Sequence, residues 1–306
     1  MRDQDPLTGD TVIEAFDEYL RRTRGICPEV RRTYSKFARE FLEAVLGDGP
    51  LDLALVSAPD VVDFVTAATA QYRRSTVQLL TTSLRSFFRF LRAQGLREDR
   101  LEETVPTVPN HRLASVPRHL STDEFARLLG SLDTSSPRGV RDRAILLCVA
   151  RLGLRASEVA RLGLEDIDWR SGTVQIRSRK TGHGAVLPLA TEVGEAIAEY
   201  LQRGRPTSTG RQVFVLHRQH VGEPIDPGVV RDAVRRSLRH AGISAPICGA
   251  NLLRHSLATD LLGHGASLKE IADLFGHRSL GSTQIYAKAN VGALREVALP
   301  WPEVTQ

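Results

Sequence analysis

Cysteine and lysine are both scarce in this sequence. The cysteines, Cys27, Cys148 and Cys248, are odd in number and far apart, so they indicate neither a disulfide framework nor a metal site. Lysine supplies only four of the 41 basic residues. The arginines that supply the rest have planar side chains that suit bidentate contacts to phosphate. A GC-rich genome produces the same bias, so the composition permits a polyanionic partner without requiring one.

Long apolar runs and nucleotide-binding motifs are missing as well. No segment reaches the roughly 18 consecutive apolar residues that a membrane helix requires, and no apolar stretch follows the acidic residues 1–5. We therefore expect a soluble, cytoplasmic protein without a membrane partner. The sequence contains no G-x-x-x-x-G-K-[ST] phosphate loop and no evident metal-ligand cluster. We expect no ATP, no metal and no other cofactor.

The rest of the composition is that of a folded protein. Its 306 residues suffice for about two ordinary domains. A hydrophobic content of 42% and a charged content of 25% argue against wholesale disorder. The formal net charge of +5 is compatible with a nucleic acid as partner.

Residues 7–105 are predicted to form a small helical bundle. Apolar side chains recur there at helical spacing. The predicted inward-facing sets are Val12, Ile13, Phe16, Tyr19 and Leu20, then Val30, Tyr34, Phe37, Phe41 and Val45, and finally Val77, Leu80, Leu84, Phe87, Phe88 and Leu91. The last set belongs to a helix expected from Ser75 to Gln94. Residues 106–117 contain Pro106, Pro109 and Pro117 without periodicity, which predicts an interdomain linker.

Residues 118–306 are predicted to form a second, mainly α-helical domain with a small antiparallel β-sheet. Capping boxes at 121–124 and 267–270 begin two of its helices. Thr173–Arg177 and Ala185–Leu189 are predicted to pair as strands around a polar turn. Gly276 is expected to end the helix that starts after Ser267.

Short motifs in this second domain carry the candidate chemistry. They are 152–158 with Arg155, 177–182 with Lys180, 253–259 with Arg254, 274–279 with His277, and 282–288 with Tyr286. In this order they resemble the two arginine boxes, the hairpin lysine, the late histidine and the nucleophile box of tyrosine recombinases, the family of phage integrases and Xer-type resolvases. Each motif alone is weak, but their joint order is strong. The N-terminal bundle also resembles the SAM-like core-binding domain of this family.

The resemblance implies covalent catalysis by Tyr286. A phenol with a pKa near 10 is only ~0.1% ionised at neutral pH, so attack on a phosphodiester needs groups that create or stabilise the phenolate. Arg155 and Arg254 would neutralise charge developing on the phosphate. Lys180 would protonate the departing 5′ oxygen, and His277 would donate a hydrogen bond to the phosphate or take the tyrosine proton.

Supporting roles are expected for Glu158 and His255. Glu158 follows Arg155 by three residues, so its carboxylate is expected to hold that guanidinium in position. His255 follows Arg254 directly and is expected to brace the helix or support the site from behind the reacting groups.

Asn251 departs from the family pattern. The family usually carries histidine or lysine at this position, three residues before the second arginine. An asparagine side chain can hydrogen-bond a phosphate oxygen but cannot shuttle a proton at neutral pH. It is also a favourable helix N-cap, and both interpretations stay open. The general base would then be His277 or His255, or the arginines alone would suffice.

Basic residues near two predicted helix starts in the N-terminal bundle are candidates for DNA contact. The positions are Arg31, Arg32, Arg73, Arg74, Ser75 and Thr76, and Arg85 projects from the helix that follows. Arginines at helix N-termini can bind a phosphate backbone. A solvated surface explains the same pattern, and the sequence does not decide between the two.

The C-terminal residues 293–302 resemble the tail of integrases from transposable elements. In the wider family this segment docks on a neighbouring protomer. Packing against its own core is the alternative for this chain.

The resemblance as a whole implies a site-specific recombinase that cuts and rejoins double-stranded DNA through a 3′-phosphotyrosine and a Holliday junction. It implies a homotetramer on paired DNA sites, with accessory recombinases as possible further partners. We expect integration or transposition of a mobile element. Alternatives are Xer-type dimer resolution, a type IB topoisomerase and a non-catalytic DNA-binding regulator.

Overall fold

The computed structural model describes residues 8–47, 51–109, 118–177, 184–244 and 249–276, together with Thr283 and Tyr286. The chain divides into two compact units between His111 and Arg112, a point inside the segment expected as the linker. Within the described residues, no helix combines the length and the apolar character needed to cross a membrane.

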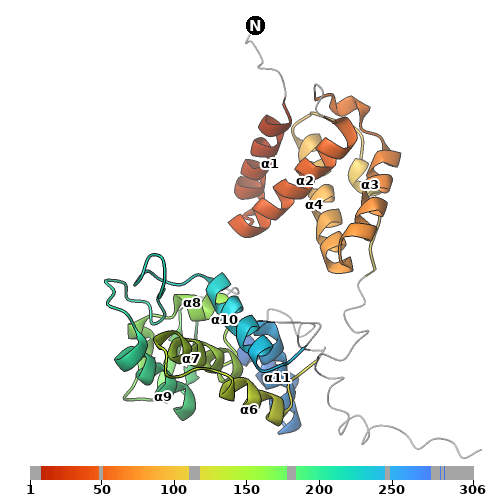
Figure 1. Cartoon of the computed structure of the whole chain (residues 1–306). Helices are drawn as coiled ribbons and strands as arrows, with labels where there is room; N and C mark the ends of the chain where they lie inside the picture. The colour runs from red at the N-terminus through yellow and green to blue at the C-terminus, as the bar shows by residue number, and fades with distance from the viewer. Residues whose placement is uncertain are drawn as a thin grey trace, which may run out of the picture. The chain divides into compact units, whose positions relative to one another are not determined.

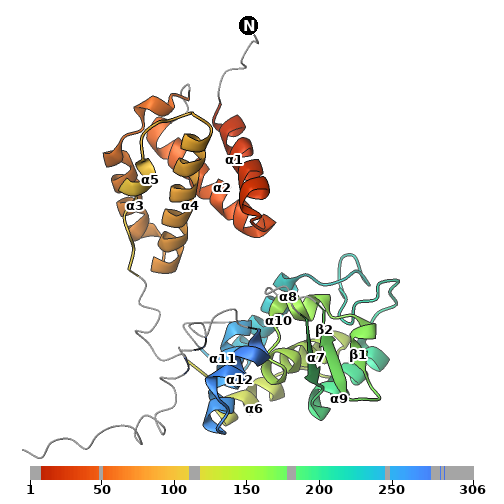
Figure 2. The same ribbon diagram turned by 180° about the vertical axis from the view of Figure 1, so that it is seen from behind.

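The described part of the first unit is built from helices (Figures 1 and 2). Its elements are α1 (Gly9–Arg24), α2 (Pro28–Leu46), the short 3₁₀ helix η1 (Leu53–Leu55), α3 (Ala58–Gln71), α4 (Arg74–Ala93) and α5 (Leu101–Thr104). Local chemistry sets several boundaries. The side chain of Thr8 caps α1, Gly25 ends it in the left-handed conformation, and the Ser57–Asp60 capping box starts α3.

Aromatic side chains fill the centre of this unit. Phe16 packs edge-on against Phe87 with ring centroids 5.2 Å apart, and Phe41 packs edge-on against Phe88 at 5.4 Å. The predicted inward face of α4 is fully buried: Val77, Leu80, Leu84, Phe87, Phe88 and Leu91. The helical period read from the sequence therefore identified the buried face of α4, whereas Tyr19, Val30, Tyr34 and Val45 of the other predicted sets are only partly buried.

The second unit combines helices with a small sheet. Its elements are α6 (Thr122–Gly130), α7 (Pro137–Arg151), α8 (Ala156–Arg161), η2 (Leu164–Asp166), β1 (Ile167–Asp168), β2 (Thr173–Ile176), β3 (Ala185–Pro188), α9 (Thr191–Glu199), the π-helical turn η3 (Tyr200–Gly204), α10 (Pro227–His240), α11 (Ala250–Gly263) and α12 (Leu268–Phe275). Both predicted capping boxes are present, and Gly276 ends α12 in the left-handed conformation.

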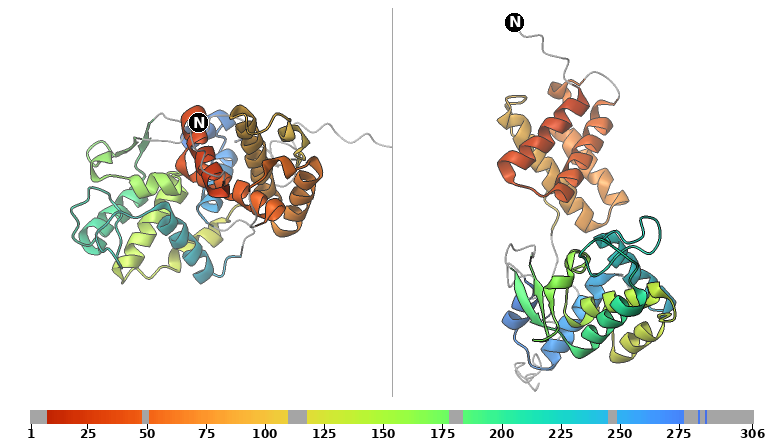
Figure 3. Two further views of the ribbon diagram at one scale, coloured as in Figure 1. Left: turned by 90° about the horizontal axis from the view of Figure 1, so that it is seen from above. Right: turned by 90° about the vertical axis from the view of Figure 1, so that its left-hand side faces the viewer.

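The sheet is antiparallel with the order β1-β2-β3. Val174 pairs with Leu187 and Ile176 with Ala185, as the predicted hairpin requires. Strand β1, which pairs with β2 through Ile167 and Val174, was not predicted because it is too short to show a period. In the right-hand view of Figure 3 the sheet lies at one side of the helices of this unit.

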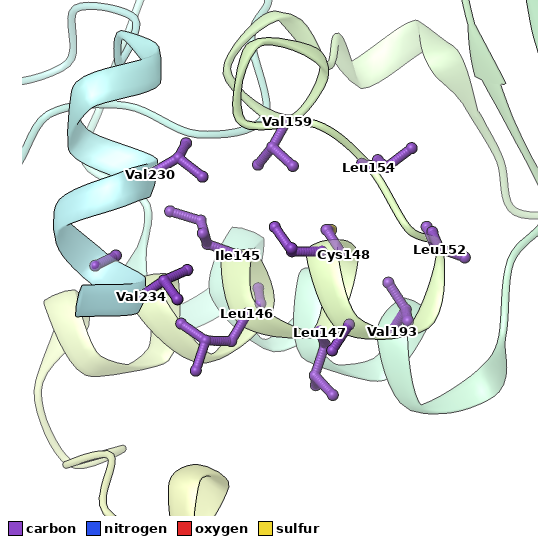
Figure 4. Packing of buried hydrophobic residues seen from close by; sticks show 14 of the residues in the cluster. Ile145, Leu146, Leu147, Cys148, Leu152, Leu154, Val159, Val193, Val230 and Val234 are labelled. Carbon is purple, nitrogen blue, oxygen red and sulfur yellow. The ribbon is translucent and has the colours of Figure 1, made fainter. Parts of the chain in front are cut away.

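Helix α7 is the central element of the second unit. Its residues from Val140 to Ala150 are almost all buried. Figure 4 shows Ile145 and Cys148 of α7 beside Val230 and Val234 of α10 and Val159 of α8. Because α7 is enclosed, the turn that follows it, which carries Arg155, starts from a fixed point.

Candidate active site

Arg155 stands at the N-cap of α8, immediately after α7 and a tight turn. Glu158 is almost fully buried and accepts two hydrogen bonds from this residue. One comes from the Arg155 backbone N–H to Oε2 at 2.8 Å, and the other from its Nη1 to Oε1 at 2.8 Å. The Arg155 side chain keeps 24% of its surface exposed. Glu158 therefore fixes a guanidinium that still faces solvent, as predicted from the three-residue spacing of the two side chains.

Arg254 lies on α11 and is 6% exposed. Its Nη1 donates to the backbone oxygen of Gly153, in the turn before Arg155. The centre of its guanidinium lies 4.4 Å from the ring centroid of Phe275, a cation–π contact with the end of α12. This single side chain joins α11, the Arg155 turn and α12.

Gly153 is the residue that permits this close approach. Its φ is +63°, a conformation that side chains other than glycine rarely adopt. A Cβ at this position would lie 2.5 Å from Cε1 of Phe275. The Leu-Gly-Leu sequence is therefore required by the contact between the turn and α12, not only by the turn itself.

A second hydrogen bond connects Arg155 to the end of α12. Its Nη2 donates to the backbone oxygen of Gly276 at 3.2 Å. Gly276 directly precedes His277 in the sequence, although His277 itself lies outside the described residues. The predicted position of His277 next to the arginines stays a prediction.

Tyr286 lies against the same cluster and is 3% exposed. Its hydroxyl is 2.8 Å from Nδ1 of His255, and its ring centroid is 6.4 Å from that of Phe275. Burial raises the pKa of the Tyr286 phenol to about 12, against the opposing effect of the positive charge on Arg254. The hydroxyl is thus protonated and held by a histidine ring.

His255 and Phe275 both contact Tyr286. His255 was expected to brace the helix, to support the site or to serve as an alternative general base, and its ring lies against the Tyr286 hydroxyl. Burial, followed by the positive charge of Arg254, lowers the pKa of His255. Phe275 was not identified at all, because an apolar residue at the end of an amphipathic helix gives no signal beyond core packing.

Asn251 is not a helix N-cap, so that interpretation is wrong. Helix α11 begins at Ala250 and Gly249 is its N-cap, with φ +123°. The boundary lies earlier than expected because glycine can adopt this backbone conformation at low cost. Asn251 is instead an exposed residue in the first turn.

Lys180 also lies outside the described residues. The described strands on either side of it are paired, since Ile176 at the end of β2 pairs with Ala185 at the start of β3. At the end of β2 the side chain of Arg177 forms an ion pair with the nearly buried Asp166. The strand that leads towards Lys180 is therefore anchored to η2.

The candidate DNA-contact residues of the first unit differ in their surroundings. Arg32, Arg73, Arg74 and Ser75 are exposed, and Thr76 is partly buried. Arg31 is partly buried and lies 3.0 Å from Asp17.

Arg85 is engaged within the first unit. Its Nη2 donates to the backbone oxygens of Val105 and Pro106 at 2.9 and 3.0 Å. These bonds hold the segment after α5 against α4. Contact between Arg85 and DNA stays a prediction.

Comparison with known proteins places this arrangement in a family. The Phage integrase family matches residues 118–292, and the phage integrase N-terminal SAM-like domain matches residues 13–95. A Sinorhizobium fredii protein named as integrase/recombinase y4rA is 41% identical over 305 residues, which are 99% of this chain and 74% of that protein. The tyrosine recombinase XerC of Halalkalibacterium halodurans is 31% identical over 302 residues, 95% of this chain and 97% of that one.

A solved structure shares the fold. The XerH site-specific recombinase bound to palindromic difH substrate superposes with a TM-score of 0.74 at 20% identity, over 95% of this chain and 85% of that chain. The chain belongs to the phage integrase family of tyrosine recombinases, which are DNA strand-transferring enzymes.

Proposed function

We propose that Tyr286 attacks the scissile phosphate of duplex DNA and forms a 3′-phosphotyrosine. The observation that carries this proposal is that contacts through Gly153 and Phe275 link Arg155, Arg254 and Tyr286. Arg254 bonds to the turn before Arg155 and stacks on Phe275, and the ring of Phe275 lies edge-on to that of Tyr286. A phosphate bound by the two guanidiniums would lie near the tyrosine.

The two arginines would neutralise charge on the nonbridging oxygens in the transition state. Preorganised donors of this kind typically contribute ~10²–10³ each in rate. Arg155 is suited to this role because Glu158 fixes its orientation before DNA binds. Lys180 would give a proton to the departing 5′ oxygen, and His277 would bond to the phosphate.

The substrate in this proposal is a specific duplex site, bound by several copies of the chain. XerH was solved with a palindromic DNA substrate, and a palindrome presents the same half-site to two protomers. We propose a homotetramer on two paired sites, with strand exchange through a Holliday junction. Residues 293–302 would dock on a neighbouring protomer, and accessory recombinases are further partners to test.

The exposed Arg32, Arg73 and Arg74 are the proposed backbone contacts of the first unit. Arg73 and Arg74 stand at the start of α4, where free backbone N–H groups also favour an anion. Contacts of this kind position the protein on DNA without reading bases.

Integration or transposition of a mobile element is the proposed biological role. The likeness to a protein named integrase/recombinase over 99% of the chain supports it. Dimer resolution is the second candidate, because the XerC relative matches this chain over 97% of its own length.

The first experiment is covalent trapping on nicked suicide duplexes made from DNA that flanks the gene. Mass spectrometry of the adduct should locate a nucleotide on Tyr286. Tyr286→Phe should form no adduct yet bind DNA as before, because it loses the nucleophile and no charge. Tyr200→Phe is the matched control, since Tyr200 is also buried in this unit. An adduct on the Tyr286→Phe variant would contradict the assignment.

Lys180 is tested on a substrate with a 5′-bridging sulfur, whose departure needs no proton. Lys180→Ala should slow cleavage of normal DNA and recover on this substrate. If the sulfur substrate is cleaved just as slowly, Lys180 is not the acid.

A further inference from the structure

The hydrogen bond between His255 and Tyr286 joins a proton acceptor to the attacking atom. Nδ1 of His255 lies 2.8 Å from the tyrosine hydroxyl, and the two ring centroids are 5.4 Å apart with a tilt of 56°. Both rings are largely removed from solvent. The roles proposed for Arg155 and Arg254 do not involve this hydrogen bond.

The tyrosine needs such an acceptor because its own ionisation is unfavourable here. With the pKa of Tyr286 raised to about 12 by burial, only about one molecule in 10⁵ would carry a phenolate at pH 7. The charge of Arg254 offsets this effect only in part. Transfer of the proton to a neighbouring base during attack avoids a free phenolate.

His255 has the protonation state that a base requires. Its pKa is lowered from 6.5 by burial and by Arg254, so the ring is neutral at pH 7. With the ring proton on Nε2, the lone pair of Nδ1 points at the tyrosine hydroxyl. Among the described residues, Arg254 and Tyr286 are the charged and titratable groups placed against this ring.

Asn251 cannot fill this role, because an amide takes up no proton at neutral pH. It stands one helical turn before His255 on α11, and residues four apart lie on the same side of a helix. On the side of α11 that contacts Tyr286, His255 is therefore the residue that can accept a proton, within the described part of this helix.

We propose that His255 is the general base that accepts the hydroxyl proton of Tyr286 during attack on the scissile phosphorus. The bond between the tyrosine oxygen and phosphorus forms while the bond between phosphorus and the 5′ oxygen breaks. The tyrosine proton goes to Nδ1 of His255, and the leaving oxygen takes its proton from the separate acid. In the rejoining step a 5′-hydroxyl attacks the phosphorus and gives its proton back to the deprotonated acid. The bond between phosphorus and the tyrosine oxygen breaks, and His255 returns its proton to that oxygen. This inference rests on the proposed function of Tyr286.

The test measures the single-turnover rate of adduct formation on the same nicked duplexes. His255→Ala should slow adduct formation by ~10²–10⁴, the usual range for a general base. His264→Ala is the matched control, because His264 caps the same helix and its side chain is 79% exposed. Tryptophan fluorescence during urea unfolding checks that each variant is folded.

Two further arms separate proton transfer from positioning. His255→Asn keeps a hydrogen-bonding atom near the place of Nδ1 but cannot take a proton, so it should be as slow as His255→Ala. A ring-fluorinated tyrosine in place of Tyr286 has a lower pKa and should restore the His255→Ala rate to within ~10-fold of the wild-type rate. The 5′-sulfur substrate should not restore it, because His255 does not act on the leaving group.

The pH profile gives an independent readout. The wild-type rate should fall as the pH drops through the lowered pKa of His255, below 6.5, because the protonated ring cannot accept a proton. His255→Ala should lose this step and rise steadily as the pH increases.

Several results would overturn the proposal. If His255→Ala formed the adduct at the wild-type rate or faster, the His255–Tyr286 hydrogen bond would only restrain the tyrosine, and His255 would not be the general base. A wild-type rate for His255→Asn would reduce it to a positioning contact, and rescue by the sulfur substrate alone would make His255 an acid. Failure of the proposed function looks different, since wild-type protein would then form no adduct on Tyr286 at all.

Discussion

Replacement of Gly153 by alanine tests how the two arginines are held together. At φ +63° an alanine costs about 1–2 kcal/mol more than glycine. The added Cβ would also lie 2.5 Å from Cε1 and 2.9 Å from Cδ1 of Phe275. Phe275 is 1% exposed and stacks on Arg254, so its ring has little room to move. Overpacking of this kind typically costs about 1–3 kcal/mol, which gives a total of about 2–5 kcal/mol.

Gly172→Ala supplies the matched control. Gly172 has φ +61° in the same unit, and a Cβ there would meet nothing within 4 Å. It should cost only the backbone strain of about 1–2 kcal/mol. The difference between the two variants isolates the contact with Phe275.

The assay is urea unfolding followed by tryptophan fluorescence, together with the rate of adduct formation. Both tryptophans, Trp169 and Trp301, belong to the second unit, so the signal reports that unit alone. Gly153→Ala should unfold at lower urea than Gly172→Ala and should cleave at least ~10-fold more slowly, because displaced Phe275 no longer supports Arg254. Equal midpoints and equal rates for the two variants would refute the reasoning.

Three further changes test other parts of the molecule. Glu158→Gln can keep only one of its two hydrogen bonds to Arg155, and a hydrogen bond to a charged group is worth about 1.5–3 kcal/mol. The rate of adduct formation should therefore fall ~10–100-fold. Glu165→Gln, at an exposed position, is the control and should change that rate little. Arg254→Lys keeps the charge but loses the planar guanidinium that bonds to Gly153 and stacks on Phe275. The single-turnover rate of cleavage should therefore fall ~10²–10³-fold, while DNA binding stays nearly unchanged. Arg74→Ala should weaken duplex binding and reduce the slope of log K against log salt by about 1, measured by titration at several salt concentrations.

Each of these predictions has a clear contrary result. Equal adduct rates for Glu158→Gln and Glu165→Gln would show that the carboxylate does not orient the arginine. Full cleavage by Arg254→Lys would mean that charge alone suffices at that position. An unchanged salt slope for Arg74→Ala would leave that residue as solvated surface.

The boundaries of many elements follow from bonds between residues three or four apart, and these could be predicted. The capping boxes at Ser121 and Ser267 and the left-handed Gly276 are examples. The buried face of α4 also followed from helical spacing. The two-residue β1 could not be predicted, since it exists only by pairing with β2. The N-cap interpretation of Asn251 was wrong because Gly249 moves the start of α11 earlier.

The sequence by itself determined the family motifs, the helical class of both units and the residue types of the site. Only the tertiary structure decided how those residues meet. Arg254 bonds to Gly153 across 101 residues, and Arg155 bonds to Gly276 across 121 residues. His255 reaches Tyr286 across 31 residues. Local sequence carries no signal for such contacts, because their geometry depends on the packing of α7, α11 and α12 into one core, and that packing fixes which side chains share a bond.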